Sequence, residues 1–163
     1  MPNDKLRRLL WTNNSRTARK QYIERMAQVE GLRILSSNMR FLDYEQSNEH
    51  RDSFGQHCSS SITEGFPSRE PALEVVDHAL STFVGNLIVL PRSLSMVGVF
   101  AVDSYIFYSC YQAFLKFEGE TLRLITESQD SIICLFTQEG AAPHFERLLN
   151  IIDFNRPAAP QFL

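Results

Sequence analysis

The side chains best suited to chemistry stand together in the stretch "GQHCSSS", residues 55–61. A cysteine acts as a nucleophile when a base lies within hydrogen-bond reach and positive surroundings lower its thiol pKa. On an extended chain, however, His57 and Cys58 point to opposite sides. The neighbouring carboxylates also raise a thiol pKa. We therefore expect a polar connector here, and we keep a small thiol-dependent enzyme around Cys58 as an alternative.

The histidines of the chain do not have the spacing of a metal site. Structural zinc ligands usually come in paired short spacings of Cys and His. His50, His57, Cys58 and His78 form no such pair. The sequence also contains no Walker loop, no Gly-x-Gly-x-x-Gly and no Gly-x-Ser-x-Gly elbow. We expect no catalytic residues, no metal and no cofactor, and hence a protein that is not an enzyme.

The elements that would position any site are predicted from hydrophobic periodicity. Ser15 and Gly31 bracket an amphipathic helix, preceded by a short helix over 4–11 whose leucines pack nearby. Further helices are expected over 71–85 and 143–154, and a hairpin around Ser36, Ser37 and Asn38. Short apolar strands are predicted over 86–90, 95–102, 121–127 and 131–137.

This order of elements predicts an α+β fold. We expect an antiparallel sheet of about four to six strands, with N-terminal, central and C-terminal helices packed on one face of it. A chain of 163 residues, 44% of them hydrophobic, suits a single domain over residues 1–163. Residues 1–14 and 155–163 are expected to be loosely held ends, and residues 46–69 a polar loop.

Cysteine content and hydropathy bear on the compartment. Three cysteines do not make a disulfide framework, so a reducing compartment is the simpler expectation. We find no secretory signal and no uncharged stretch long enough to span a membrane. The sequence therefore predicts a soluble, intracellular and cytoplasmic protein.

Aromatic residues concentrate between positions 100 and 117. As a strand, the segment 104–117 would carry aromatic side chains on both faces, and those left uncovered would form a surface for a partner or for self-association. As a helix, it would gather most of them on one face. We favour the strand, and we predict partner binding through Tyr105, Tyr108, Tyr111 and Phe114.

Charge is unevenly distributed along the chain. Residues 1–40 hold nine Lys or Arg and three Asp or Glu, whereas the remainder holds seven and sixteen. Arg7, Arg8, Arg16 and Lys20 are candidate anion-binding residues, which makes a nucleic-acid-associated protein a second alternative. The cations form no single stripe on a helical wheel, and the pI near 5.8 is acidic. Arg19 falls in the apolar arc, where we expect its stem to pack and its head to reach water.

These observations favour a non-catalytic protein-interaction domain over the two alternatives. An adaptor, a chaperone-like binder or an inhibitor subunit would each use an aromatic surface without catalytic residues. Such a domain would bind a protein partner or associate with itself.

Overall fold

Six helices and seven strands make up the part of the chain that the structure describes. This computed structural model describes residues 2–60, 64–66, 69–139 and 145–153. The helices are α1 (Pro2–Ala27), α2 (Arg33–Ser36), α3 (Tyr44–Ser60), α4 (Arg69–Thr82), α5 (Leu94–Val97) and α6 (Ser104–Phe117). The strands are β1 (Arg40–Phe41), β2 (Glu64–Phe66), β3 (Asn86–Val89), β4 (Phe100–Asp103), β5 (Leu122–Thr126), β6 (Ser131–Glu139) and β7 (Phe145–Asp153).

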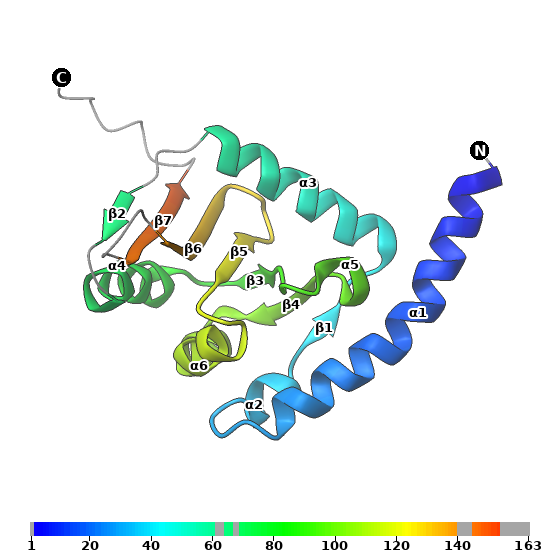
Figure 1. Ribbon diagram of the computed structural model, residues 1–163, viewed down its shortest axis with the longest axis horizontal. Helices are drawn as coiled ribbons and strands as arrows, with labels where there is room; N and C mark the ends of the chain where they lie inside the picture. Colours follow the sequence, from blue (N-terminus) through cyan, green and yellow to red (C-terminus); the bar gives the residue numbers. More distant parts are fainter. Residues whose placement is uncertain (1, 61–63, 67–68, 140–144, 154–163) are drawn as a thin grey trace.

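The strands form one antiparallel sheet in the order β1-β4-β3-β5-β6-β7-β2. At its centre Ile88 of β3 is opposite Ala101 of β4 on one side and Ile125 of β5 on the other. The two edge strands, β1 and β2, are the shortest of those described. Figure 1 shows α3 on one side of the sheet, α4 and α6 on the other, and α1 as a long rod whose first turns project from the body.

The sheet carries a hydrophobic core on each face, because its strands send alternate side chains to opposite sides. Leu87 and Val89 of β3 join the core that α1, α2, α4 and α6 cover, together with Phe100 and Phe114. Ile88 lies in the second core, which α3 covers. Helices thus cover both faces, where the sequence predicted cover on one, and strands buried on both faces read as uninterrupted apolar runs.

The predicted fold class is confirmed as α+β with an antiparallel sheet and packed helices. The helix predicted over 71–85 is α4, with Leu73, Val76 and Leu80 buried. The runs predicted as strands overlap β3, β4, β5 and β6, but the first half of the run over 95–102 is wrong, because helix α5 ends only at Val97. The sheet has seven strands where four to six were expected. The single domain remains a prediction, and residues 155–163 lie outside the described part of the chain.

The prediction of a polar loop over 46–69 is wrong, because α3 occupies most of it. Asp43 and Gln46 form a reciprocal capping box at its start: Asp43 Oδ1 accepts from the Gln46 N–H at 2.8 Å, and Gln46 Oε1 accepts from the Asp43 N–H at 3.3 Å. Phe54 then packs the helix into the second core. The segment is helical because it is capped at its start and packs one side, with Ser47, His50 and Phe54, against the body.

The segment 104–117 is helix α6, so the favoured strand interpretation is wrong. Asp103 caps the helix, with Oδ1 accepting from the N–H groups of Tyr105 at 2.9 Å and Ile106 at 3.4 Å. The helical alternative also explains the burial, because Phe107, Cys110, Tyr111, Phe114 and Leu115 are buried on one face. Most of the aromatic side chains are therefore core residues.

Three smaller predictions also differ from the structure. The predicted helix over 143–154 is wrong, because its described part is β7, which pairs with β6 and β2. The predicted hairpin around Ser36 is replaced by α2 followed by β1. Ser15 is no N-cap: it is buried inside α1, where its hydroxyl donates to the Thr12 carbonyl at 3.1 Å. Residues 2–14, expected to be loosely held, are the first half of this continuous helix.

Candidate functional site

Two of the four aromatic residues predicted to bind a partner are buried. On α6, Phe114 and Tyr111 are core residues, Tyr108 is half-buried, and Tyr105 has 80% of its surface exposed. Phe114 contacts the rings of Phe100 and Phe107 at centroid distances of 6.1 and 5.4 Å. Phe114 and Tyr111 are therefore not part of an exposed aromatic surface, because the helix turns them inward, whereas partner binding through Tyr105 and Tyr108 stays a prediction.

Tyr108 and Tyr111 instead connect α6 to α4 through one carboxylate. Their hydroxyls donate to Asp77 at 3.1 and 3.0 Å, and their rings stack at 6.1 Å. The hydrogen bond to Asp77 raises the pKa of Tyr108, and burial raises that of Tyr111. Both phenols therefore stay protonated near neutral pH and act as donors. Asp77 serves as an acceptor between two helices.

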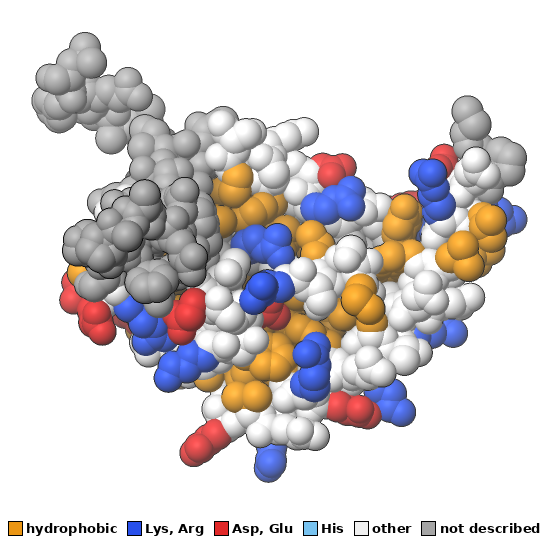
Figure 2. Space-filling view, in the orientation of Figure 1, with side chains coloured by type: hydrophobic (Ala, Val, Ile, Leu, Met, Phe, Trp, Pro, Cys, Tyr) orange, Lys and Arg blue, Asp and Glu red, His pale blue; other side chains and the backbone are white. Residues whose placement is uncertain are grey.

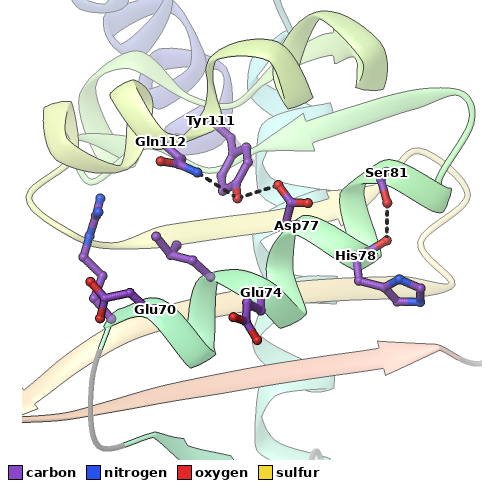
Figure 3. A pocket seen from close by; sticks show the side chains of 9 residues that line it. Glu70, Glu74, Asp77, His78, Ser81, Tyr111 and Gln112 are labelled. Carbon is purple, nitrogen blue, oxygen red and sulfur yellow. Dashed lines mark hydrogen bonds between the residues drawn. The ribbon is translucent and has the colours of Figure 1, made fainter.

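A groove of about 500 Å³ lies beside this connection, between α4 and α6. Figure 3 shows Tyr111 reaching from α6 to Asp77 on α4, with Gln112 next to it. Glu70, Glu74 and His78 also line the groove. Its polar groups are engaged locally, as in the hydroxyl of Ser81 that donates to the His78 carbonyl at 2.9 Å. The groove shows no convergent set of catalytic groups.

His57 and Cys58 lie on α3 and not on a loop. His57 Nε2 is 3.1 Å from the carbonyl oxygen of Gln129. Burial raises the pKa of the Cys58 thiol, with Cys134 and Arg123 acting in the opposite direction. A cysteine with a raised pKa is mostly thiol at neutral pH and a weak nucleophile. Among the described residues, no group of three His, Cys, Asp or Glu side chains is placed to hold a metal ion, so His50, His57, Cys58 and His78 do not come together in one.

His50, on the buried side of α3, predicts a pH dependence of stability. Its Nδ1 has no hydrogen-bond partner in the described structure. Burial lowers the His50 pKa, and the carboxylates of Glu49 and Glu127 oppose this only in part. Because the folded pKa lies below the unfolded value near 6.5, the fold favours neutral His50. The stabilisation of the fold by neutral His50 is fully present above pH 6.5 and is lost as the pH falls through the folded pKa.

We expect the free energy of unfolding, measured with urea between about pH 7.5 and 5.5, to fall more steeply for the wild type than for His50→Gln. His78→Gln, at an exposed histidine on α4, is the matched control and should follow the wild type. Parallel curves for His50→Gln and the wild type would contradict this assignment.

Helix α1 is attached to the body along one side by Arg19. Its Nε donates to the Val97 carbonyl at 2.8 Å and its Nη2 to the Leu42 carbonyl at 2.6 Å. The guanidinium lies between the rings of Trp11 and Phe41, at 5.1 and 4.8 Å from their centroids. Burial lowers the Arg19 pKa. The head group predicted to reach water is instead bound by two carbonyls and two rings.

Two further residues, Trp11 and Tyr22, bond α1 to the body on either side of Arg19 in the sequence. The Trp11 Nε1–H donates to the Ser95 carbonyl at 3.0 Å. Tyr22 donates its hydroxyl to buried Glu118, which also accepts the Arg92 N–H at 2.8 Å. Burial, followed by the charge of Glu118, raises the Tyr22 pKa. These bonds fix which side of α1 faces the protein and which side faces solvent.

The opposite side of α1 carries exposed leucines. Leu6, Leu9 and Leu10 are 56%, 54% and 53% exposed, and we call them the leucine stripe. At 100° per residue they fall within an arc of about 100°, roughly opposite the buried Tyr22 and Met26. Figure 2 shows hydrophobic side chains among Lys and Arg on the projecting end of α1. The sequence predicted that these leucines pack nearby, but the structure leaves them in solvent.

The four predicted anion-binding residues are all exposed on α1 but do not share one face. Arg8 is paired with Glu45 of α3 at 2.8 Å, on the side that faces the body. On the helical wheel Arg16 lies beside the leucine stripe, Lys20 lies within the same arc but about three turns further along the helix, and Arg7 lies beyond the other border. The four residues therefore do not form one continuous basic surface.

No protein family matches the chain, and no curated protein or solved structure shows significant similarity to it. Within the described residues, no helix is both long and apolar enough to cross a membrane. A functional proposal therefore depends on the chemistry of the exposed surfaces.

Proposed function

We propose that this protein is a non-catalytic protein-interaction domain that presents the leucine stripe of α1 to an acidic protein partner. The observation that carries the proposal is the exposure of Leu6, Leu9 and Leu10 on one side of a helix whose other side is bonded to the body. A firmly held helix loses little conformational freedom when it binds, so less of the interaction energy is lost to ordering.

The stripe has the pattern of a helix that binds in a groove. Anchors at i, i+3 and i+4 are typical of amphipathic helices that place their apolar side in a hydrophobic groove of a partner. Each leucine of the stripe is about half exposed, so complete burial of each contributes about 1 kcal/mol. Together the three account for about a hundredfold in affinity.

Charge indicates the kind of groove. Helix α1 contains seven Lys or Arg and two Asp or Glu, a net charge of +5. The chain as a whole carries −3, so the remainder carries −8. Pairing of two α1 helices would bring like charges together, which disfavours a symmetric dimer through this helix. A hydrophobic groove with acidic residues at its rim is the complementary partner.

The proposal includes a cytoplasmic location and the absence of catalysis. All three cysteines are thiols in the structure, which suits a reducing compartment. The raised pKa of Cys58 and the local pairing of His57 support a role other than catalysis. The basic residues on α1 keep nucleic acid as the competing partner, and the experiment below separates the two.

The test compares the full chain with the triple variant Leu6→Gln, Leu9→Gln and Leu10→Gln. Gln keeps helix propensity while removing apolar surface. A protein captured by the wild type is purified, and its Kd is measured by calorimetry. We expect the triple variant to bind about a hundredfold more weakly and to unfold within about 0.5 kcal/mol of the wild type. Val84→Gln, at a side chain 91% exposed away from α1, is the matched control.

Three outcomes would contradict the proposal. The first is equal affinity of the triple variant and the wild type. The second is a wild-type dimer in light scattering that the triple variant abolishes, since the stripe would then bind a second copy. The third is binding to single-stranded DNA that weakens steeply with salt and with Arg16→Glu while tolerating the leucine changes, which would favour nucleic acid.

A further inference from the structure

Two cysteines meet between α3 and the sheet. Cys58 packs against the second core from α3, and Cys134 belongs to that core from β6. Their side chains are hydrogen-bonded to one another, although the residues are far apart in the sequence. Cys58 is partly accessible, whereas Cys134 is buried. The two thiols therefore lie side by side, on two elements that no covalent bond joins.

The surroundings give the two thiols different roles. Burial raises the pKa of Cys58 and the hydrogen bond with Cys134 lowers it only in part, whereas burial and the interaction with Cys58 both raise the pKa of Cys134. Cys134 is therefore the donor, and its S–H stabilises a thiolate on Cys58. Burial raises the Cys134 pKa to about 12, and Arg123 of β5 lowers the pKa of both thiols in part. Of the two, Cys58 is the one that ionises first and the one that an oxidant can reach.

We propose that Cys58 and Cys134 form a reversible disulfide that ties α3 to β6 when the protein meets a small-molecule disulfide such as oxidised glutathione. This modification does not rest on the proposed role of α1. The new bond is about 2 Å long, so it brings the sulfurs closer than the hydrogen bond does.

The reaction proceeds by two thiol–disulfide exchanges. The Cys58 thiolate attacks one sulfur of oxidised glutathione, forms a mixed disulfide and releases one glutathione thiolate, which takes up the proton lost by Cys58. Cys134, once deprotonated, attacks the Cys58 sulfur and releases the second glutathione. Two protein thiols are thus oxidised to one disulfide while one glutathione disulfide is reduced to two glutathione thiols. Excess reduced glutathione reverses both steps.

Cys110 is an internal control for this reaction. It lies on α6 in the other core, and its thiol donates to the carbonyls of Ile106 at 3.4 Å and Phe107 at 3.6 Å. Burial raises its pKa to about 11. Non-specific oxidation of cysteines would also involve Cys110, whereas the proposed reaction leaves Cys110 reduced.

The test treats the full chain with oxidised glutathione at about pH 8.5, where more of Cys58 is thiolate. We expect the total number of free thiols, counted in denaturant, to fall from the three of the sequence to one. Peptide mapping should join the Cys58 and Cys134 peptides. The melting temperature should rise by on the order of 10 °C and return to its starting value with reductant.

Variants decide between this modification and its alternatives. Cys110→Ala should still form the disulfide, and Cys58→Ser should retain both remaining thiols. A stable glutathione adduct on Cys58 of the wild type without a protein disulfide would overturn the proposal. So would a mapped bond that includes Cys110. Because mapping uses the wild-type chain, the result does not depend on the folding of any variant.

Discussion

Phe114→Ala should lower the free energy of unfolding by about 3 to 5 kcal/mol, the largest effect expected of any single change considered for this protein. The side chain is 1% exposed and its ring contacts those of Phe100, Phe107 and Phe117. Removing it leaves a cavity that the surrounding sheet and helix cannot fill, since both are fixed by other contacts. Urea unfolding of the purified variant measures the loss.

Tyr105→Ala is the matched control on the same helix. Its side chain is 80% exposed, so we expect a change within about 0.5 kcal/mol. The pair of variants separates the core side of α6 from its solvent side. An unchanged stability for Phe114→Ala would show that the residue is not in the core. It would then support the sequence prediction that Phe114 belongs to a partner-binding surface.

Arg19→Met should lower the free energy of unfolding by about 3 kcal/mol. Methionine keeps an apolar stem of comparable reach but removes both donors, so the carbonyls of Val97 and Leu42 lose the bonds seen in the structure. Each such bond to a charged group contributes about 1.5 kcal/mol or more. The loss of stacking on Trp11 and Phe41 adds to this.

The single tryptophan of the sequence provides a local readout of this change. Because Trp11 contacts the Arg19 guanidinium, its fluorescence should change in the folded state of Arg19→Met. Arg19→Lys should lose about half as much stability, since one ammonium cannot reproduce the planar fork. Arg16→Met, at an exposed position on the same helix, should be nearly neutral. Equal unfolding midpoints for the Arg16 and Arg19 variants would contradict the attachment of α1 through Arg19.

The strands were the part of the fold most visible in the sequence. Runs such as Asn86–Val89 are short and apolar and give a clear strand signal. The same runs also indicate burial on both faces, because a strand with one solvated face would alternate with polar residues. The second layer formed by α3 could have been inferred from this, but its own sequence gives little apolar periodicity.

Helix α3 escaped prediction because its buried stripe is mostly polar. Ser47, His50, Phe54 and Cys58 recur at helical spacing, yet only Phe54 is strongly hydrophobic. Helix formation is signalled instead by "DYEQ", residues 43–46, in which Asp43 and Gln46 form the capping box. Asp103 gives a similar signal at the start of α6. Local capping was a better guide to these helices than apolar pattern.

The candidate site could not have been located from the sequence alone. Leu6, Leu9 and Leu10 have the spacing of a core-facing stripe, and nothing local distinguishes burial from exposure. Their position is decided nine to sixteen residues further along by Arg19 and Tyr22, whose contacts orient the whole helix. A continuous helix transmits that orientation to its first turns. Only the tertiary structure shows which side is left to solvent.

The sheet ends at both edges in strands of two and three residues, β1 and β2. Such short edge strands offer an incoming peptide few unpaired backbone groups. In β1 the exposed, charged side chain of Arg40 also disfavours pairing with another strand. At the β1 edge we expect this to discourage growth of the sheet from chain to chain. Recognition by strand addition at this edge is discouraged for the same reason, so we expect contacts with other molecules there to be made side chain to side chain.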